Sequence, residues 1–446
     1  MALALLLAAA AAAAASPTPS PQRPELRAVA AEVKPAELHA TVEALVGFGT
    51  RHTLSGTQGP SRGIAPARDW TASRFAEIAR ACGGCLEVAR PSQRVTGARM
   101  PKEGAVVEDV LAIQRGTTDP GRVVVISAHI DSRVTEVMNA TADAPGANDD
   151  GSGVAAVIEA ARVLSRRKFP ATVVYAVLSG EEQGLLGGKV LADHARAQGW
   201  RVEAVLNNDI VGNTTGQNGA RDDRTVRVFS EGTKSTETFE EGRRRRGVGG
   251  EMDSPSRNLS RWIEGLSTPD LRVRMIARLD RYGRGGDQTP MLEAGFPAVR
   301  LTESVENWDR QHQDLRPGYG DLTAGVDFAY LAKVTRLNAV ALAALAWAPP
   351  PPEGVKVEGA LKDDTTVTWA AAPGAARYRV WWRDSLDPRW THSQDAGAAA
   401  TAVVKDRVVD DWLFGVQAIS AEGWASPVVY PGAAGSFVSA PPPPKP

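Results

Sequence analysis

The sequence predicts an α/β fold, in which a mainly parallel mixed sheet is sandwiched by helices, followed by a C-terminal all-β sandwich of the immunoglobulin-like kind. Two observations support this. From about residue 26 to residue 348, strand-like apolar runs alternate with helix-like segments, which is typical of a parallel sheet covered by helices. After a short proline run, the pattern changes to brief alternating runs separated by turn residues, which is typical of an antiparallel sandwich.

The elements of the first region follow from their apolar patterns. RVVVISAH (122–129) is a continuous β-branched run, which suits a strand buried on both faces. In the following segment, Val154, Ile158 and Ala161 recur at helical spacing. Further strands are expected at TVVYAVLS, VEAVLNNDIV and FPAVRLTE, and further helices at LLGGKVLADHARAQ and at 327–347. The stretch from about 213 to 270, rich in Gly, Arg, Ser and Glu, is expected to be an insertion rather than a central strand.

The N-terminus differs in character from the rest of the chain. Residues 2–15 form an apolar stretch of roughly 14 residues, too short to span a bilayer but suited to the core of a secretory signal. We therefore expect residues 1–15 to be a signal peptide and the protein to be secreted or periplasmic. No Lys or Arg precedes the stretch, so a disordered Ala-rich leader is the alternative. Residues 16–25 are expected to be flexible, and no other segment is expected to span a membrane.

Composition and cysteine content narrow the class of protein. With 446 residues, 43% of them apolar, and a net charge of -1, the chain reads as globular, and nothing indicates nucleic acid as a partner. Cys82 and Cys85 form a single CxxC, which is too few thiolates for a four-cysteine zinc site. In an exported protein, a short-range disulfide is the expected outcome.

The C-terminal region divides into a proline linker (349–352), a β domain (353–437) and a disordered tail (438–446). Trp369, Tyr378 and the run FGVQAISAEGWASP resemble the core positions of a fibronectin type III module. The match departs at Phe414, where that family often has the tyrosine of the tyrosine corner. Such a module is expected to be a spacer or a contact to a surface or polysaccharide.

Candidate metal ligands occur where predicted strands end. His129, the pair Glu181-Glu182 and Asp209 each stand at or just after the end of an apolar run, and Asp149 opens a predicted helix in the turn GANDDGSG. His312 lies in the loop after the last strand. In open α/β sheets, ligands bind outside the carboxyl ends of the strands, so we expect these side chains to converge. The sequence predicts an enzyme site there.

The residue types suit two divalent metals about 3.5–4 Å apart, which need a bridging carboxylate and further N or O ligands. Asp149 is the expected bridge, with His129 and Asp209 completing one metal and Glu182 and His312 the other. The catalytic residues are expected to be Glu181, as general base toward the attacking water and the leaving amine, and Asp131. Asp131 lies two residues after His129 and is expected to fix the imidazole tautomer.

Each motif alone has an ordinary structural explanation. A lone HxD is compatible with a surface or capping role, a Glu-Glu pair with an exposed acidic surface, and NDDGSG with a helix N-cap. Only their joint occurrence at strand ends favours a metal site.

The motifs AHID, PGANDDGSG, SGEEQGLLG, NNDIVG and RQHQD together resemble the di-zinc exopeptidases typified by secreted bacterial leucyl aminopeptidases. Glutamate carboxypeptidase and the glutaminyl cyclases are relatives of that family. The resemblance implies two zinc ions, the five ligands above, Glu181 as base and a cis peptide between Asp149 and Asp150. Gln288 departs from the pattern, since relatives often have His after Asp, and this puts substrate specificity in doubt.

The leading hypothesis is an exported zinc aminopeptidase that acts on peptides, with acidic groups such as Glu181 and Asp209 attracting the substrate ammonium. A glutaminyl cyclase that uses one zinc and a carboxypeptidase that uses Arg284 or Arg300 for the terminal carboxylate are the enzyme alternatives. A binding protein with an inactive peptidase scaffold is the alternative of another class. Side-chain preference and oligomeric state are not predicted.

Overall fold

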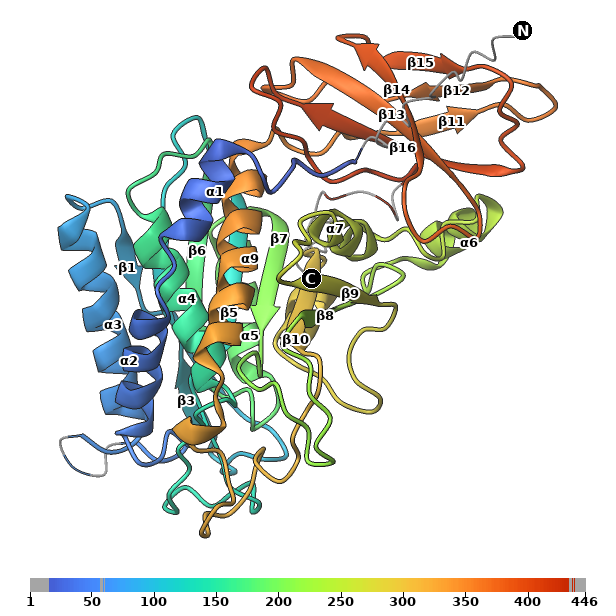
Figure 1. The fold of residues 1–446 in the computed structure, drawn as a ribbon. Coiled ribbons are helices and arrows are strands. Elements are labelled where there is room, and N and C mark those ends of the chain that lie inside the picture. The colour runs from blue at the N-terminus through green and yellow to red at the C-terminus, as the bar shows by residue number, and fades with distance from the viewer. Residues whose placement is uncertain (1–15, 57–58, 60, 433–434, 436, 438–446) are drawn as a thin grey trace, which may run out of the picture.

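The structure, a computed structural model, describes residues 16–437 apart from 57–58, 60, 433–434 and 436. The predicted signal peptide and the predicted C-terminal tail lie outside the described residues. The centre is an eight-stranded sheet in the order β1-β4-β6-β5-β7-β10-β8-β9 (Figure 1). Its strands are β1 (Glu87–Ala89), β4 (Val110–Gln114), β5 (Asp119–His129), β6 (Ala171–Leu178), β7 (Arg201–Asn208), β8 (Thr225–Ser230), β9 (Arg272–Ile276) and β10 (Ala298–Glu303).

The sheet is mixed, with a parallel centre. Strands β6, β5, β7 and β10 run parallel to one another, so their carboxyl ends meet at one edge. β1 and β4 add antiparallel pairs on one side, while β8 pairs antiparallel with β10 and parallel with β9 on the other. The predicted fold class, a mainly parallel mixed sheet between helices, is confirmed.

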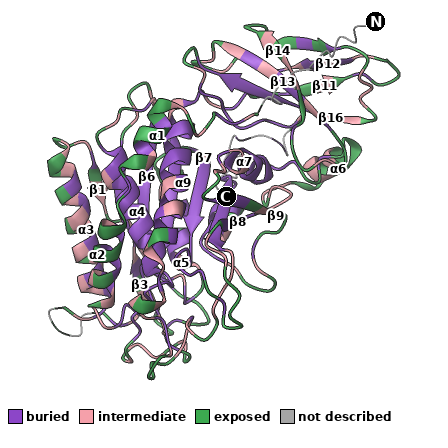
Figure 2. Cartoon of the chain, in the orientation of Figure 1, coloured by how far each residue is buried: buried purple, intermediate pink, exposed green. Residues whose placement is uncertain are grey.

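Helices cover both faces of this sheet (Figures 1 and 2). Within β5, Val124 and Ile126 face one apolar core, while Val123 and Val125 face the other. The first core is covered by α1 (Pro24–Ala31), α2 (Pro35–Val46), α3 (Ile64–Ala81), α4 (Gly151–Leu164), α7 (Pro255–Glu264) and α9 (Phe328–Trp347). The second is covered by α5 (Leu186–Ala197) and α8 (Gln288–Glu293). The continuous β-branched runs are therefore strands buried on both sides, as their sequence predicts.

Helix α9 meets the length and apolar composition of a membrane span, contrary to the expectation that no segment after the N-terminus would. However, 78% of its most apolar window is buried inside the protein, where it packs against α1, α2 and α4. Its apolar character follows from a central position in the core.

The prediction that residues 213–270 contain no central strand is wrong. β8 lies in this stretch and sits inside the sheet, between β10 and β9. Val226 and Val228 supply its buried apolar face. The stretch also contains α6 (Phe239–Gly247), whose residues are not buried, and α7.

The segment 16–25, predicted to be flexible, contacts distant parts of the protein. The Thr18 hydroxyl donates to the Trp262 carbonyl at 2.7 Å, and the Arg23 guanidinium lies 3.9 Å from the centre of the Trp424 ring. The flexibility of this segment stays a prediction. The Cys82–Cys85 disulfide is present, as predicted. Shorter elements are the hairpin β2 (Ser92–Val95) and β3 (Ala105–Glu108) and the 3₁₀ turn Thr323–Gly325.

The C-terminal region is an antiparallel β module of two three-stranded sheets. One sheet has the order β11-β12-β15 and the other β14-β13-β16. Their strands are β11 (Lys356–Glu358), β12 (Thr365–Thr368), β13 (Arg377–Asp384), β14 (His392–Gly397), β15 (Thr401–Val404) and β16 (Trp412–Ile419). Val367 and Trp369 beside one sheet and Tyr378 and Val380 on the other belong to the same apolar cluster, so the sheets enclose a core.

The module is docked against the α/β domain rather than tethered to it. Asp253, just before α7, is fully buried and accepts from Arg383 of β13 at 2.7 and 3.0 Å. Arg261 of α7 donates to the same carboxylate at 2.9 Å. The Trp390 indole donates to Asn258 at 3.2 Å. The proline linker is mostly buried, so it acts as part of this interface.

Candidate metal centre

The predicted site residues converge at the carboxyl edge of the parallel strands, although they are up to 183 positions apart in the sequence. His129 is the last residue of β5, and Asp209 directly follows β7. Glu181 and Glu182 follow β6, Asp149 precedes α4, and His312 lies in the loop after β10.

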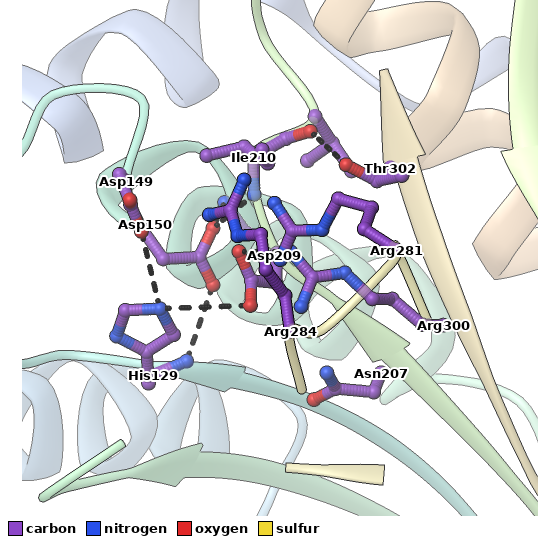
Figure 3. A network of polar contacts seen from close by, with 12 residues as sticks. His129, Asp149, Asp150, Asn207, Asp209, Ile210, Arg281, Arg284, Arg300 and Thr302 are labelled. Carbon is purple, nitrogen blue, oxygen red and sulfur yellow. Dashed lines mark hydrogen bonds and ion pairs between the residues drawn. The ribbon is translucent and has the colours of Figure 1, made fainter. Parts of the chain in front are cut away.

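Asp149 lies between two groups of side chains. Its Oδ1 is 3.3 Å from His129 Nε2, and its Oδ2 is 2.9 Å from His312 Nε2. Asp209 Oδ2 lies 3.9 Å from His129 Nε2 (Figure 3). Glu182 Oε1 lies 3.0 Å from His312 Nε2. We call His129 with Asp209 the His129 half-site and His312 with Glu182 the His312 half-site; Asp149 faces both.

Glu181 stands beside the His129 half-site. One of its carboxylate oxygens lies within 4.8 Å of ligand atoms of His129 and Asp209. Burial and the like charges of Glu182 and Asp209 raise the pKa of Glu181 well above its usual value, against the attraction of His129. A carboxylate held at raised pKa next to the site is suited to accepting a proton.

Asp131 contacts more than the sequence suggested. His129 Nδ1 lies 3.1 Å from the Asp131 carbonyl and 3.6 Å from its carboxylate, so the carbonyl is the nearer acceptor for the ring. The carboxylate accepts from the backbone N–H groups of Glu181 and Glu182 at 3.2 and 3.0 Å. Asp131 therefore also positions the glutamate pair.

Two carboxylates that sequence reasoning missed hold the Asp149 loop. Asp321 accepts from the backbone N–H groups of Asn148 and Asp149 at 2.8 and 2.7 Å. Asp150 accepts from the backbone of His129, at 3.2 Å, and of Gly153, at 3.0 Å. The Asp149–Asp150 peptide is cis, as the resemblance implies.

The backbone next to Asp209 is strained. Ile210 has φ of 53°, a left-handed conformation that is unfavourable for a β-branched residue. It is held there because its N–H donates to Asp150 at 3.1 Å and its carbonyl accepts from the Thr302 hydroxyl at 3.1 Å (Figure 3). These contacts fix the direction in which Asp209 leaves the end of β7.

Asp209 and Glu182 are each paired with an arginine, and no sequence spacing indicates either pairing. Arg300 is fully buried and contacts Asp209 Oδ1 at 2.8 Å. Arg133 contacts Glu182 Oε2 at 2.9 Å. In each case the second oxygen of the carboxylate faces a histidine. Gln288, expected on the substrate side, is instead buried and donates to Asp280, which also accepts from Arg300.

The donor set fits divalent cations. Among the described residues, His129 Nε2 and Glu182 Oε1 are buried ligand atoms without a hydrogen bond. Although burial alone would lower the pKa of His129, Glu181, Asp131 and Asp149 raise it well above its usual value. So many carboxylates around two imidazoles favour a positive charge between them, and imidazole and carboxylate ligands suit zinc.

Comparisons with known proteins agree with this geometry. The model of peptidase family M28 matches residues 109–319, which contain the five candidate ligands and Glu181. A "Probable zinc metalloprotease" of Pyricularia oryzae is 43% identical over 426 residues, which cover 91% of this chain and 84% of that protein. A "Probable zinc metalloprotease" of Pyrenophora tritici-repentis is 41% identical over 423 residues, with 91% and 86% covered.

Among solved structures, the LapA aminopeptidase of Legionella pneumophila has a TM-score of 0.51 at 20% identity, covering 72% of this chain and 74% of that one. This level of likeness shows a shared fold alone. Both of these metalloprotease relatives are fungal, so the narrower resemblance to secreted bacterial leucyl aminopeptidases is not confirmed. Sequence and site together establish that the chain belongs to the zinc metallopeptidases of family M28.

Proposed function

We propose that this metallopeptidase is an exported aminopeptidase that removes N-terminal amino acids from peptides with two zinc ions. The observation that carries the proposal is the position of Asp149, whose two oxygens face the two histidines at 3.3 and 2.9 Å. With Asp209 and Glu182 beyond them, two cations would share one bridging carboxylate. Such a pair, when bound, polarises the scissile carbonyl and lowers the pKa of water.

The chain's own residues supply the proton transfers. Glu181 lies beside the His129 half-site, where it can accept a proton from the attacking water and deliver it to the leaving amine. Asp131 keeps Glu181 and Glu182 in place through their backbone N–H groups. Since Asp209 is already paired with Arg300, the attraction of a substrate ammonium falls mainly on Glu181.

The carboxypeptidase alternative needs a free cation for the substrate's terminal carboxylate. Arg300 does not fit this role, because it is fully buried and contacts Asp209 and Asp280. Arg284 is 35% exposed but contacts Glu306 at 3.0 Å. Both arginines considered for this role therefore already have carboxylate partners, which favours an aminopeptidase. A glutaminyl cyclase remains an alternative that differs in using one zinc, and an inactive binding protein would be expected to have lost ligands.

Export is supported by the disulfide, because such bonds persist in oxidising compartments.

For the β module, the two sheet orders support a fibronectin type III-like fold. Its docked position favours a fixed role beside the peptidase over a free spacer. Contact with a surface or polysaccharide is tested by cosedimentation of the full chain with cell-wall material.

The experiment that tests the proposed activity compares Leu-peptides with a free amine against the same peptides N-acetylated, using zinc-loaded protein. Release of leucine only from the free-amine series is expected. Cleavage of both series, or of neither, would contradict an aminopeptidase. Glu181→Gln should lower turnover by about 10²- to 10⁴-fold, the range of a general base, while the zinc content stays unchanged. Near-normal turnover would exclude the proposed role of Glu181.

A further inference from the structure

The two histidines of the site have different surroundings on the ring nitrogen that faces away from Asp149. His129 Nδ1 faces an acceptor, the Asp131 carbonyl, at 3.1 Å. His312 Nδ1 instead faces a donor, the guanidinium of Arg133, at 2.7 Å. In both rings Nε2 points toward Asp149, so Nε2 is the atom available to a cation.

This difference matters for cation binding. A neutral imidazole that binds a metal through Nε2 carries its proton on Nδ1, and ligating histidines almost always donate that proton to an acceptor. His129 meets this requirement. For His312, a proton on Nδ1 would face a guanidinium N–H, and neither group can accept. The Arg133–His312 contact therefore favours a proton on Nε2 and opposes a cation there.

Arg133 is held in this position by other contacts. Its Nε donates to Glu182 Oε2 at 2.9 Å, and its NH1 donates to the carbonyls of Val134 and Thr135 at 3.2 and 3.3 Å. Its side chain is 16% exposed. A mostly buried positive charge thus contacts both side chains of the His312 half-site. Cation binding there must displace the guanidinium from the ring or proceed against an unpaired donor and a like charge.

The His129 half-site also has an arginine, but without this conflict. Arg300 contacts Asp209, and the structure gives no contact between Arg300 and the His129 ring among the described residues. The two half-sites therefore share a histidine, a carboxylate and an arginine on that carboxylate. They differ in what the ring nitrogen facing away from Asp149 contacts. They also differ in Glu181, which stands beside the His129 half-site, and in burial, since the side chain of His312 is 25% exposed and that of His129 is 2% exposed.

We propose that Arg133 is a positioning residue that weakens cation binding at the His312 half-site, so that the His129 half-site fills first. The proposal rests on the proposed two-zinc function. Outer partners of metal-binding histidines change metal affinity by about 10- to 100-fold, so the two half-sites should differ by at least about tenfold.

Arg133→Gln tests this directly. The amide N–H₂ can still donate to Glu182, while the amide oxygen can accept from a protonated Nδ1, and the positive charge is gone. Arg99→Gln is the matched control, because Arg99 donates to the Glu182 main-chain carbonyl at 2.9 Å but the structure gives it no contact with His312. Arg133→Lys retains the charge and serves as a second comparison.

The measurement is titration of the metal-free full chain with zinc against a chromophoric chelator. Wild type, Arg99→Gln and Arg133→Lys should each bind two zinc ions in two steps at least about tenfold apart. Arg133→Gln should tighten the second step by about tenfold or more and leave the first unchanged.

Two equal steps in the wild type, or an unchanged second step in Arg133→Gln, would overturn this inference and leave the two-zinc function standing. A single zinc in both the wild type and Arg133→Gln would overturn the two-zinc function as well. Arg133→Met, which removes the charge without an acceptor, should show an intermediate second step if Arg133→Gln does not fold.

Discussion

The buried charge cluster between the β module and the α/β domain should contribute strongly to stability. Asp253 accepts from Arg383 and Arg261, and the side chains of all three residues are at most 5% exposed. Asp253→Asn keeps the size of the side chain but removes its charge. Two guanidinium groups would then stay buried on opposite sides of the interface without a counter-ion.

Removing one partner of a buried ion pair costs about 3–5 kcal/mol, because the remaining charge stays desolvated. If roughly 420 residues unfold as one unit, the unfolding entropy is about 0.9 kcal/mol/K, so the melting temperature should fall by about 3–6 °C. Arg389→Gln is a matched control across the same interface. Arg389 pairs with Glu264 at 2.8 Å but is 57% exposed, so its loss should cost at most about 1 kcal/mol, or about 1 °C.

Differential scanning calorimetry of the metal-free full chain measures both changes. The expected result is a single transition that shifts clearly more for Asp253→Asn than for Arg389→Gln. Equal shifts would refute the reasoning that buried charge holds the interface. A separate low-temperature transition in the wild type would refute the view that the module and the α/β domain unfold together.

Three further predictions concern the site and its surroundings. A chelator should abolish peptide hydrolysis and added zinc should restore it, as measured by leucine release. Asp321→Asn, which leaves one of two backbone N–H groups of the Asp149 loop facing an amide N–H₂ instead of an acceptor, should weaken zinc binding by about 10- to 100-fold in the same chelator titration. Although burial opposes it, Arg281 and its neighbours lower the pKa of Glu306 to about 2, so its stabilisation is present above about pH 4.5 and lost as pH falls toward 2. Glu306→Gln should therefore lose about 3 kcal/mol at pH 7, and its melting temperature should approach that of the wild type at pH 3.

The parts of the fold that the sequence predicted are those with one dominant pattern. β5 and β6 are unbroken β-branched runs, and α4 shows clear helical spacing. β8 escaped prediction because Arg227 stands in its middle. The side chain of Arg227 donates to the Glu303 carbonyl at 2.7 Å and pairs with Glu306. The sequence therefore shows a charged residue at a strand position that lies inside the sheet. The charge of Arg227 is neutralised by Glu306, which lies in a distant loop. No local sequence pattern shows this pairing.

The same distinction applies to the site. Ligand types at strand ends were predictable, because parallel strands bring their carboxyl ends together whatever the loops contain. Asp321 was not, since it lies 172 positions after Asp149, the residue whose loop it holds, and acts on backbone N–H groups. Asp150 stands in the NDDG turn, which gave a local signal, but its bond to the His129 backbone depends on the fold. A carboxylate that binds backbone groups has no required spacing to the ligands it positions.

The difference between the half-sites is a feature that no local sequence pattern displays. His129 and His312 are the same residue type, and both face Asp149 through Nε2. One difference between them is a carbonyl beside the His129 ring and a guanidinium beside the His312 ring, supplied by Asp131 and Arg133 within the same short loop. A site with an acceptor beside both rings would hold two cations with similar strength, whereas a stronger conflict at His312 would leave one. Because a one-zinc cyclase and a two-zinc aminopeptidase share most of the ligand types, we expect the outer partner of His312, together with the ligand set, to influence how many cations the site holds.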